Sequence, residues 1–206
     1  VQQLNTVSAF MPGRLSINIV AGSSTAEQRG YGDYLAHDER YARADEFLAV
    51  CHSFWRDNGD VNFDGKYYQV EHGKLHTPFF ARERGVPEIY ISGHSEQAQQ
   101  LARSKGTCSL RVADTPENLC AAVARTRELG IEVCLRMCVI CRPTRQEAID
   151  VAEWLLPEDD LGQYERSVAV KNDSQMYREA SQVENRWLSP LLWTGFVPYY
   201  GPVWTT

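Results

Sequence analysis

The chain has 206 residues, of which 43% are hydrophobic, and it carries a formal net charge of −6. This length allows one substantial hydrophobic core but not two comfortable ones. Acidic and basic residues are interspersed without a basic stripe, which argues against a nucleic-acid partner. An anionic small-molecule ligand is still compatible with this net charge, because a local pocket can be positive inside an acidic protein.

The cysteines and the hydropathy pattern predict a cytoplasmic protein. Several cysteines lie in apolar runs, which favours reduced thiols packed in the core over a disulfide framework or a zinc site, so no metal is expected. No apolar run approaches the roughly 20 residues that span a bilayer, so no membrane contact is expected. The first residues lack the pattern of a signal peptide, and the absence of an initiator Met suggests a chain cut upstream. The cysteines are Cys51, Cys108, Cys120, Cys134, Cys138 and Cys141.

Helix and strand patterns alternate along the chain, which favours an α/β class. Residues 2–10 are predicted to be the last part of a helix, and a strand rich in β-branched residues follows at 15–20. The polar loop at 22–37 is long enough to be an active-site feature. Asp38 is predicted to cap a helix that extends to about Trp55. Its apolar stripe is Tyr41, Ala44, Leu48, Cys51 and Trp55.

A hairpin with a tight Asp64-Gly65 turn is predicted over residues 61–70. The second half then alternates again, and it ends in weak helical signals and a tail rich in proline, glycine and aromatic residues. One domain without a linker is expected. The predicted strands are 88–91, 107–112 and 131–141; the predicted helices are 96–105, 116–129, 144–156, 160–170 and 174–188.

The turn Ser92-Gly93-His94-Ser95 lies between a predicted strand and a predicted helix. Free backbone N–H groups and the positive end of the helix dipole make such a turn a site for an anion. Gly93 permits close approach of the backbone, and the Ser95 hydroxyl can donate to a phosphate. The alternative is that Ser95 is a plain helix cap.

Other polar residues lie where strands meet the following loops or helices. Asn18 is near the end of a strand, and His37 and Tyr41 flank the start of the long helix; each could instead be structural. Arg136 lies in the longest predicted strand, whose alternation places it on one face with Cys134 and Cys138. A charged residue there needs a charged ligand, an internal ion pair or a solvent-facing edge.

Six stretches, in the same order, resemble the bacterial-luciferase-like flavin-dependent monooxygenases. The likeness is nearest to the two-component alkanesulfonate monooxygenase branch and extends over nearly the whole chain. The stretches are residues 13–22, 36–47, 63–68, 89–96, 135–140 and 189–195.

The resemblance implies a (β/α)8 TIM barrel of which this chain supplies only the central portion, with units missing at both ends. Members of the family bind reduced FMN that a separate flavin reductase delivers, and they use O2 to oxygenate a small organic substrate. A homo-oligomer is also implied. Two alternatives remain within the resemblance: a deazaflavin-dependent oxidoreductase on the same barrel, and a flavin-binding homologue that has lost catalysis. A barrel with unrelated chemistry is a third.

The resemblance also implies roles for individual residues. Arg136 would contact an anion or peroxide in the active site. Cys138 stands where the sulfonate branch has a histidine, and Tyr200 stands where that branch has an arginine in a mobile loop. Both departures weaken the case for a sulfonate, which favours a bidentate cation. A larger, less charged substrate is suggested instead by Tyr199, Tyr200 and Trp204. The implied flavin contacts are Asn18, His37 and Tyr41, and the implied phosphate contacts are Ser92, Gly93, His94 and Ser95.

Overall fold

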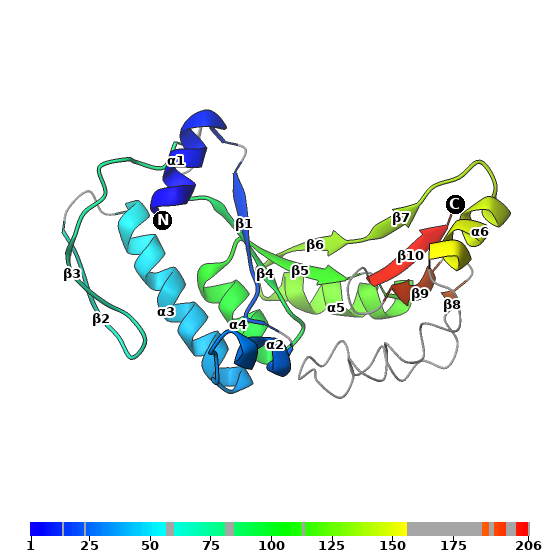
Figure 1. Ribbon diagram of the computed structural model, residues 1–206, viewed down its shortest axis with the longest axis horizontal. Helices are drawn as coiled ribbons and strands as arrows, with labels where there is room; N and C mark the ends of the chain where they lie inside the picture. Colours follow the sequence, from blue (N-terminus) through cyan, green and yellow to red (C-terminus); the bar gives the residue numbers. More distant parts are fainter. Residues whose placement is uncertain are drawn as a thin grey trace. The chain divides into compact units, whose positions relative to one another are not determined.

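The structure is a computed structural model (Figure 1) that describes most of the chain. Its described residues form two compact units. The first unit comprises 1–21, 35–92 and 96–109, and the second comprises 22–34, 93–95 and 110–206. The described ranges are 1–13, 15–22, 24–56, 60–80, 85–112, 114–155, 187–189, 192–196 and 201–205.

A four-stranded sheet has the strand order β1-β4-β5-β6. β1 and β4 run parallel, with Ser16 opposite Glu88 and Ile19 opposite Ile91. Ile89 and Ile91 of β4 are buried, because alternate residues of that strand face the core. A parallel pair with helical connections is the α/β arrangement predicted from the sequence. The strands are β1 (Ser16–Ile19), β4 (Glu88–Ser92), β5 (Cys108–Val112) and β6 (Glu132–Arg136).

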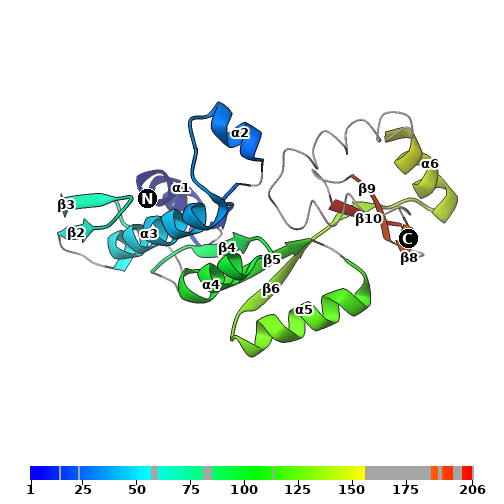
Figure 2. The ribbon, with the colours of Figure 1, turned by 90° about the horizontal axis from the view of Figure 1, so that it is seen from below.

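Helices α3 (His37–Arg56) and α4 (Glu96–Lys105) build most of the core of the first unit. α3 packs against α4, and α4 packs against β4; Figure 2 shows α3 and α4 side by side. Leu48 and Cys51 of α3 are buried, as the predicted apolar stripe requires. α4 contributes Ala98, Leu101 and Ala102 to the same core.

Buried polar residues hold α1 (Gln2–Phe10) in the first unit. The side-chain amide of Asn5 donates to the Thr77 carbonyl at 2.6 Å and accepts from the Trp55 indole N–H at 3.0 Å. The hydroxyl of Ser8 accepts from the Phe80 backbone N–H at 2.8 Å. These bonds satisfy polar groups that burial would otherwise penalise, so they fix α1 to α3 and to the segment before β4.

The predicted hairpin is confirmed, but its loop is longer than predicted. β2 (Val61–Asp64) pairs antiparallel with β3 (Gln69–Gly73), and Asp64 is opposite Gln69, so the loop has four residues, 65–68. The reason is the Glu46 carboxylate of α3. It accepts backbone N–H bonds from Lys66, Tyr67 and Tyr68 at 2.9, 2.7 and 3.2 Å, contacts that a two-residue turn could not supply.

The second unit begins with a helix inside the segment predicted to be a loop. α2 (Thr25–Gly30) starts after Ser24, whose hydroxyl accepts the Glu27 N–H at 3.2 Å. α5 (Pro116–Glu128) starts after Thr115, whose hydroxyl accepts from Asn118 N–H at 3.4 Å. Both helices begin with the hydroxyl cap that favours a helix start. α6 (Arg145–Leu155) follows Thr144 in the same way, with the Glu147 N–H at 3.3 Å.

The single strand predicted over residues 131–141 is wrong. β6 ends at Arg136 and β7 (Cys138–Ile140) begins two residues later in a different sheet, with the order β7-β10-β9-β8. β7 pairs in parallel with β10, whereas β6 lies beside β5. Alternation along a sequence predicts strand conformation but not the strand's partner, which explains the error.

Strands near the end of the chain replace part of a predicted helix. β8 (Trp187–Ser189) occupies the end of the segment predicted as helix 174–188, and β9 (Leu192–Phe196) and β10 (Gly201–Thr205) form an antiparallel pair in the predicted tail. The predicted helix 160–170 lies outside the described residues. Within the described ranges, no helix combines the length and the apolar composition that crossing a membrane would require.

Candidate functional site

Three of the predicted site residues meet in the first unit, where β1 and β4 end. The Ser92 hydroxyl donates to the side-chain oxygen of Asn18 at 2.8 Å. The Tyr41 hydroxyl donates to the Ser92 carbonyl at 3.5 Å, a long hydrogen bond from the start of α3 to the end of β4. The carboxyl ends of parallel strands are where α/β enzymes bind their ligands.

His37 joins this group through Tyr41. The two rings lie 5.0 Å apart between centroids with an interplanar angle of 56°, as residues one helical turn apart can do. The His37 Nδ1 atom is 2.8 Å from a carboxylate oxygen of Asp38. We call Asn18, His37, Tyr41 and Ser92 the strand-end cluster. Apart from the exposed Asn18, its residues are half-buried.

Arg40 lies beside the strand-end cluster and was not among the site residues predicted from the sequence. Its side chain is only 2% exposed. Its Nε donates to the Ala21 carbonyl at 3.1 Å and its Nη1 to the Leu35 carbonyl at 3.0 Å. The signal was present in the helix period, because Arg40 precedes Ala44 and Leu48 by four and eight residues on the buried stripe.

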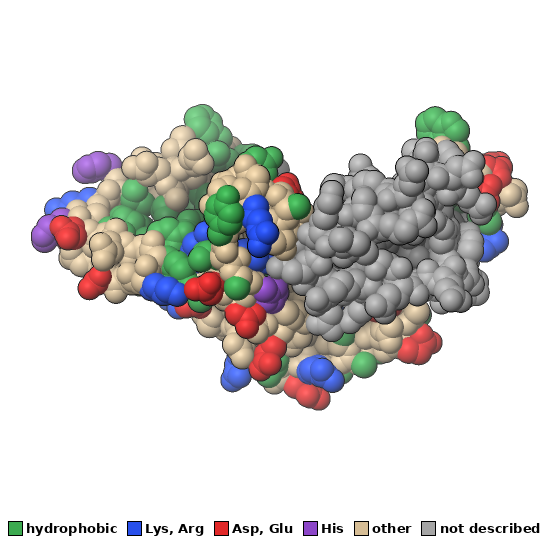
Figure 3. Space-filling model, turned by 60° about the horizontal axis from the view of Figure 1, so that its bottom comes forward, with side chains coloured by type: hydrophobic (Ala, Val, Ile, Leu, Met, Phe, Trp, Pro, Cys, Tyr) green, Lys and Arg blue, Asp and Glu red, His purple; other side chains and the backbone are tan. Residues whose placement is uncertain are grey.

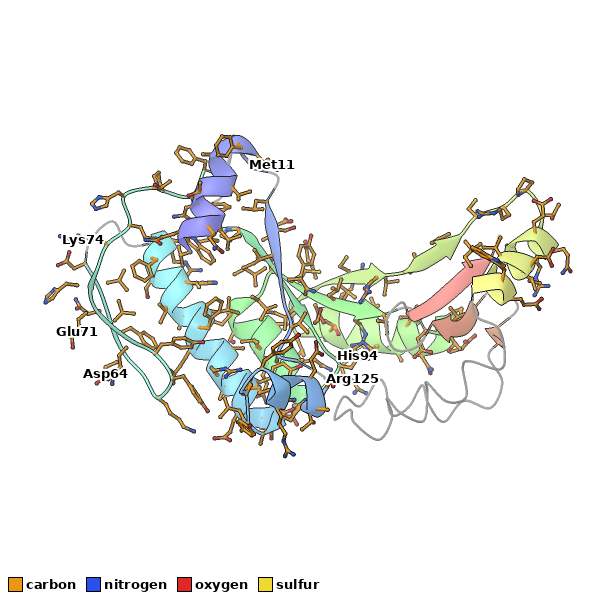
Figure 4. All side chains as sticks on the ribbon, viewed as in Figure 1. Met11, Asp64, Glu71, Lys74, His94 and Arg125 are labelled. Carbon is orange, nitrogen blue, oxygen red and sulfur yellow. The ribbon has the colours of Figure 1, made fainter. Side chains whose placement is uncertain are left out.

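The phosphate turn predicted at residues 92–95 is divided between the two units. Ser92 belongs to the first, and Gly93, His94 and Ser95 belong to the second. Gly93 has a φ of 131°, which L side chains rarely adopt, so glycine is required there. His94, labelled in Figure 4, and Ser95 are half-buried.

The structure does not unite the predicted catalytic residues. Arg136 is exposed at the end of β6, the outer strand of its sheet, while Cys138 opens β7 in the other sheet. The break at Met137 therefore removes the continuous strand that was to place Cys134, Arg136 and Cys138 on one face. The side chain of Cys138 and all of Tyr200 lie outside the described residues.

Cys138 and Cys141 also have the Cys-x-x-Cys spacing that occurs in redox and metal motifs, and Cys141 is exposed. In the portion that the structure describes, no group of three or more His, Cys, Asp or Glu residues could hold a metal ion.

On the described part of the face in Figure 3, acidic and basic side chains are interspersed. The burial of Arg111 on β5 lowers its pKa, and Arg125 of α5 lowers it further, while Asp114 opposes this.

Several solved structures share this fold. A riboflavin lyase, solved with modified FMN and its substrate riboflavin, is 19% identical with a TM-score of 0.63 over 75% of this chain and 41% of that chain. An F420-dependent secondary alcohol dehydrogenase with an F420–acetone adduct is 22% identical, with a TM-score of 0.59 over 74% and 48%. An EDTA monooxygenase from Chelativorans sp. BNC1 is 23% identical, with a TM-score of 0.62 over 82% and 46%. The chain spans less than half the length of each.

These identities are low enough that the three structures establish the fold and no more. The family assignment comes from a family profile, described as luciferase-like monooxygenase, that matches residues 1–191. This match covers both the strand-end cluster and the turn at 92–95. The chain therefore belongs to the luciferase-like monooxygenase family.

Proposed function

We propose that this chain is the central portion of an FMN-dependent monooxygenase built on a (β/α)8 TIM barrel, nearest to the two-component alkanesulfonate branch. The observation that carries the proposal is the strand-end cluster. It gathers two hydroxyls, an amide and an imidazole at the ends of two parallel strands. Barrel enzymes place their active sites at that end of the strands.

The residues present fit a flavin mononucleotide in chemical type. A flavin ring has a polar edge, which the amide of Asn18 and the hydroxyl of Tyr41 can bind. The phosphate would be bound by the turn Gly93-His94-Ser95, where a glycine with positive φ and two donor side chains suit an anion. When bound, reduced FMN supplies the reaction with O2.

The protein's own residues would orient the flavin and neutralise charge. The contact between the His37 and Tyr41 rings limits the rotamers of both side chains, which keeps the Tyr41 hydroxyl directed toward Ser92. Arg136 would stabilise an anionic group of the reacting species. Cys138 and Tyr200 stand where the sulfonate branch has a histidine and an arginine, and their lower charge favours a small organic substrate less charged than a sulfonate.

The proposal includes the partners that go with this chemistry. A separate flavin reductase would deliver reduced FMN transiently, and the enzyme would form a homo-oligomer. A cytoplasmic location is also proposed, because Cys51 and Cys108 are buried, as reduced thiols packed in a core would be.

A second candidate is a deazaflavin-dependent oxidoreductase. It is favoured by the likeness to the F420-dependent alcohol dehydrogenase, which shares the fold at a similar TM-score. The strand-end cluster could bind either cofactor, because both carry a tricyclic ring with a polar edge. The two candidates differ in the cofactor and in the need for O2.

Parallel titrations with FMN and F420 separate the two candidates. We expect saturable quenching of FMN fluorescence and no saturable binding of F420. With a flavin reductase and NADH, we further expect oxygen uptake that increases when an accepted organic substrate is added. Binding of F420 alone would contradict the proposal. FMN binding without any substrate-dependent oxygen uptake across alkyl sulfonates and neutral aromatic compounds would instead support the inactive homologue.

A further inference from the structure

A single buried side chain binds the backbone on both sides of the segment Gly22–Tyr34. This segment leaves the first unit after Ala21 and returns to it at Leu35. Arg40 donates to the carbonyls of these two flanking residues at 3.1 and 3.0 Å. The two ends of the segment are therefore held by one guanidinium.

The burial of Arg40 requires these contacts. A guanidinium withdrawn from water is strongly destabilising unless acceptors replace the water. At 2% exposure, the carbonyls of Ala21 and Leu35 provide such acceptors. Because the donors of a guanidinium are fixed in one plane, binding two carbonyls also fixes the distance between them. A lysine has the charge but lacks this rigid fork.

The two carbonyls lie close in sequence to the strand-end cluster. Ala21 is three residues after Asn18, and Leu35 is two residues before His37. Arg40 itself precedes Tyr41 on the first turns of α3. Fixing the carbonyls of Ala21 and Leu35 therefore sets the end of β1 relative to the start of α3, which is the geometry that the cluster needs.

We propose that Arg40 is a positioning residue for the strand-end cluster: by holding Ala21 and Leu35 together it keeps Asn18, His37 and Tyr41 in the arrangement that binds the flavin. This inference rests on the proposed function for its ligand. Because its side chain is only 2% exposed, Arg40 would act through the backbone on both sides of residues 22–34 and not through a contact with the flavin.

The test compares Arg40 with a buried polar residue that has no bond to the cluster. Asn5 is also 2% exposed and also bonds a backbone carbonyl, that of Thr77. Its second partner, Trp55, lies 14 residues after Tyr41 on α3, about 21 Å along the helix axis. Asn5→Ala should therefore destabilise the fold without moving the cluster.

The variants Arg40→Met, Arg40→Lys and Asn5→Ala are titrated with FMN, and their urea unfolding is measured in parallel. We expect both Arg40 variants to raise the Kd for FMN at least tenfold under conditions where they are folded, and Asn5→Ala to leave it within twofold despite its loss of stability. Equal effects on Kd in all three variants, an unchanged Kd in Arg40→Met, or failure of both Arg40 variants to fold would overturn the proposal.

Amide hydrogen exchange gives a readout that needs no flavin. We expect Arg40→Met to speed exchange in peptides that cover residues 16–22 and 35–41, and Asn5→Ala to speed it in residues 2–10 instead. If wild-type protein binds no flavin, the proposed function fails, and exchange still decides the anchoring: unchanged protection at 16–22 and 35–41 in Arg40→Met would refute it.

Discussion

Arg40 and Glu46 lie six residues apart on α3, and both use a charged side chain to bind backbone groups of another segment. The guanidinium binds two carbonyls, and the carboxylate binds three N–H groups. In each case the ligand is main chain, so the partner's sequence gives no sign of the contact. Arg40 could be placed on the buried face from the helix period, but its partners could not.

The residues that could be predicted are those with a local reason for their position. Gly93 was expected at a turn where the backbone can approach a ligand closely, and its φ of 131° gives a further reason for glycine at that position. Asn18 and Ser92 were expected near strand ends, and His37 and Tyr41 at the start of the long helix. The structure brings these four residues together. Arg136 and Cys138 were predicted to lie on one face of a continuous strand. That prediction failed because the strand is divided into β6 and β7.

At the residue scale, the double variant His94→Ala, Ser95→Ala tests the phosphate turn. Both substitutions remove donors that would form charge-assisted hydrogen bonds, so FMN binding should weaken by roughly 1–3 kcal/mol. The measurement is a fluorescence titration with FMN. The control variant is His72→Ala, since His72 lies on the exposed hairpin and should not alter the Kd. An FMN affinity of the double variant equal to that of wild type would remove the turn from the site.

Hydrophobic periodicity was sufficient to predict four of the helices, but not the length of the hairpin loop or the division of residues 131–141 into two strands. α3, α4, α5 and α6 were predicted within about two residues, because each has an apolar period and a recognisable start. The hairpin loop was predicted too short because its conformation depends on Glu46, a residue on another element. The division of residues 131–141 into β6 and β7 depends on strand partners far along the chain.

At the element scale, the pH dependence of the hairpin tests the role of Glu46. Burial raises the pKa of Glu46. The hydrogen bonds from the N–H groups of Tyr67, Lys66 and Tyr68, together with the charge of Lys66, lower this pKa by more. The pKa of Glu46 therefore lies below its usual value of 4.5. A carboxyl whose folded pKa is depressed stabilises the fold above its unfolded pKa. That stabilisation is lost as pH falls through the folded value.

We therefore expect amide hydrogen exchange in residues 61–73 to become faster, relative to the intrinsic exchange rate at the same pH, as pH falls below about 4.5. Glu46→Gln should lose most of this change and show faster exchange already at neutral pH, because one amide oxygen cannot accept all three N–H bonds. The depressed pKa values of Glu39 and Asp60 act in the same direction, so some dependence will remain. An identical pH profile in Glu46→Gln would refute the role of the carboxylate.

For the whole molecule, the α/β class with a parallel sheet was predictable because helix and strand patterns alternate along the chain. The sheet of β7, β10, β9 and β8 was not, because its strands are short and two of them lie in a segment without clear alternation. The family match extends over residues 1–191, while the chain spans less than half of each similar structure described above. The barrel, the reductase and the oligomer are therefore proposals about the complete enzyme.

The most direct measurement compares the affinities of the wild-type chain for FMN and for riboflavin, which differ only by the phosphate. If the strand-end cluster binds the ring and the turn at residues 92–95 binds the phosphate, FMN and riboflavin should both bind. The Kd of FMN should be lower by about 10-fold or more, and a tenfold difference in Kd corresponds to about 1.4 kcal/mol. Equal affinity for FMN and riboflavin, or no binding of either, would contradict this account.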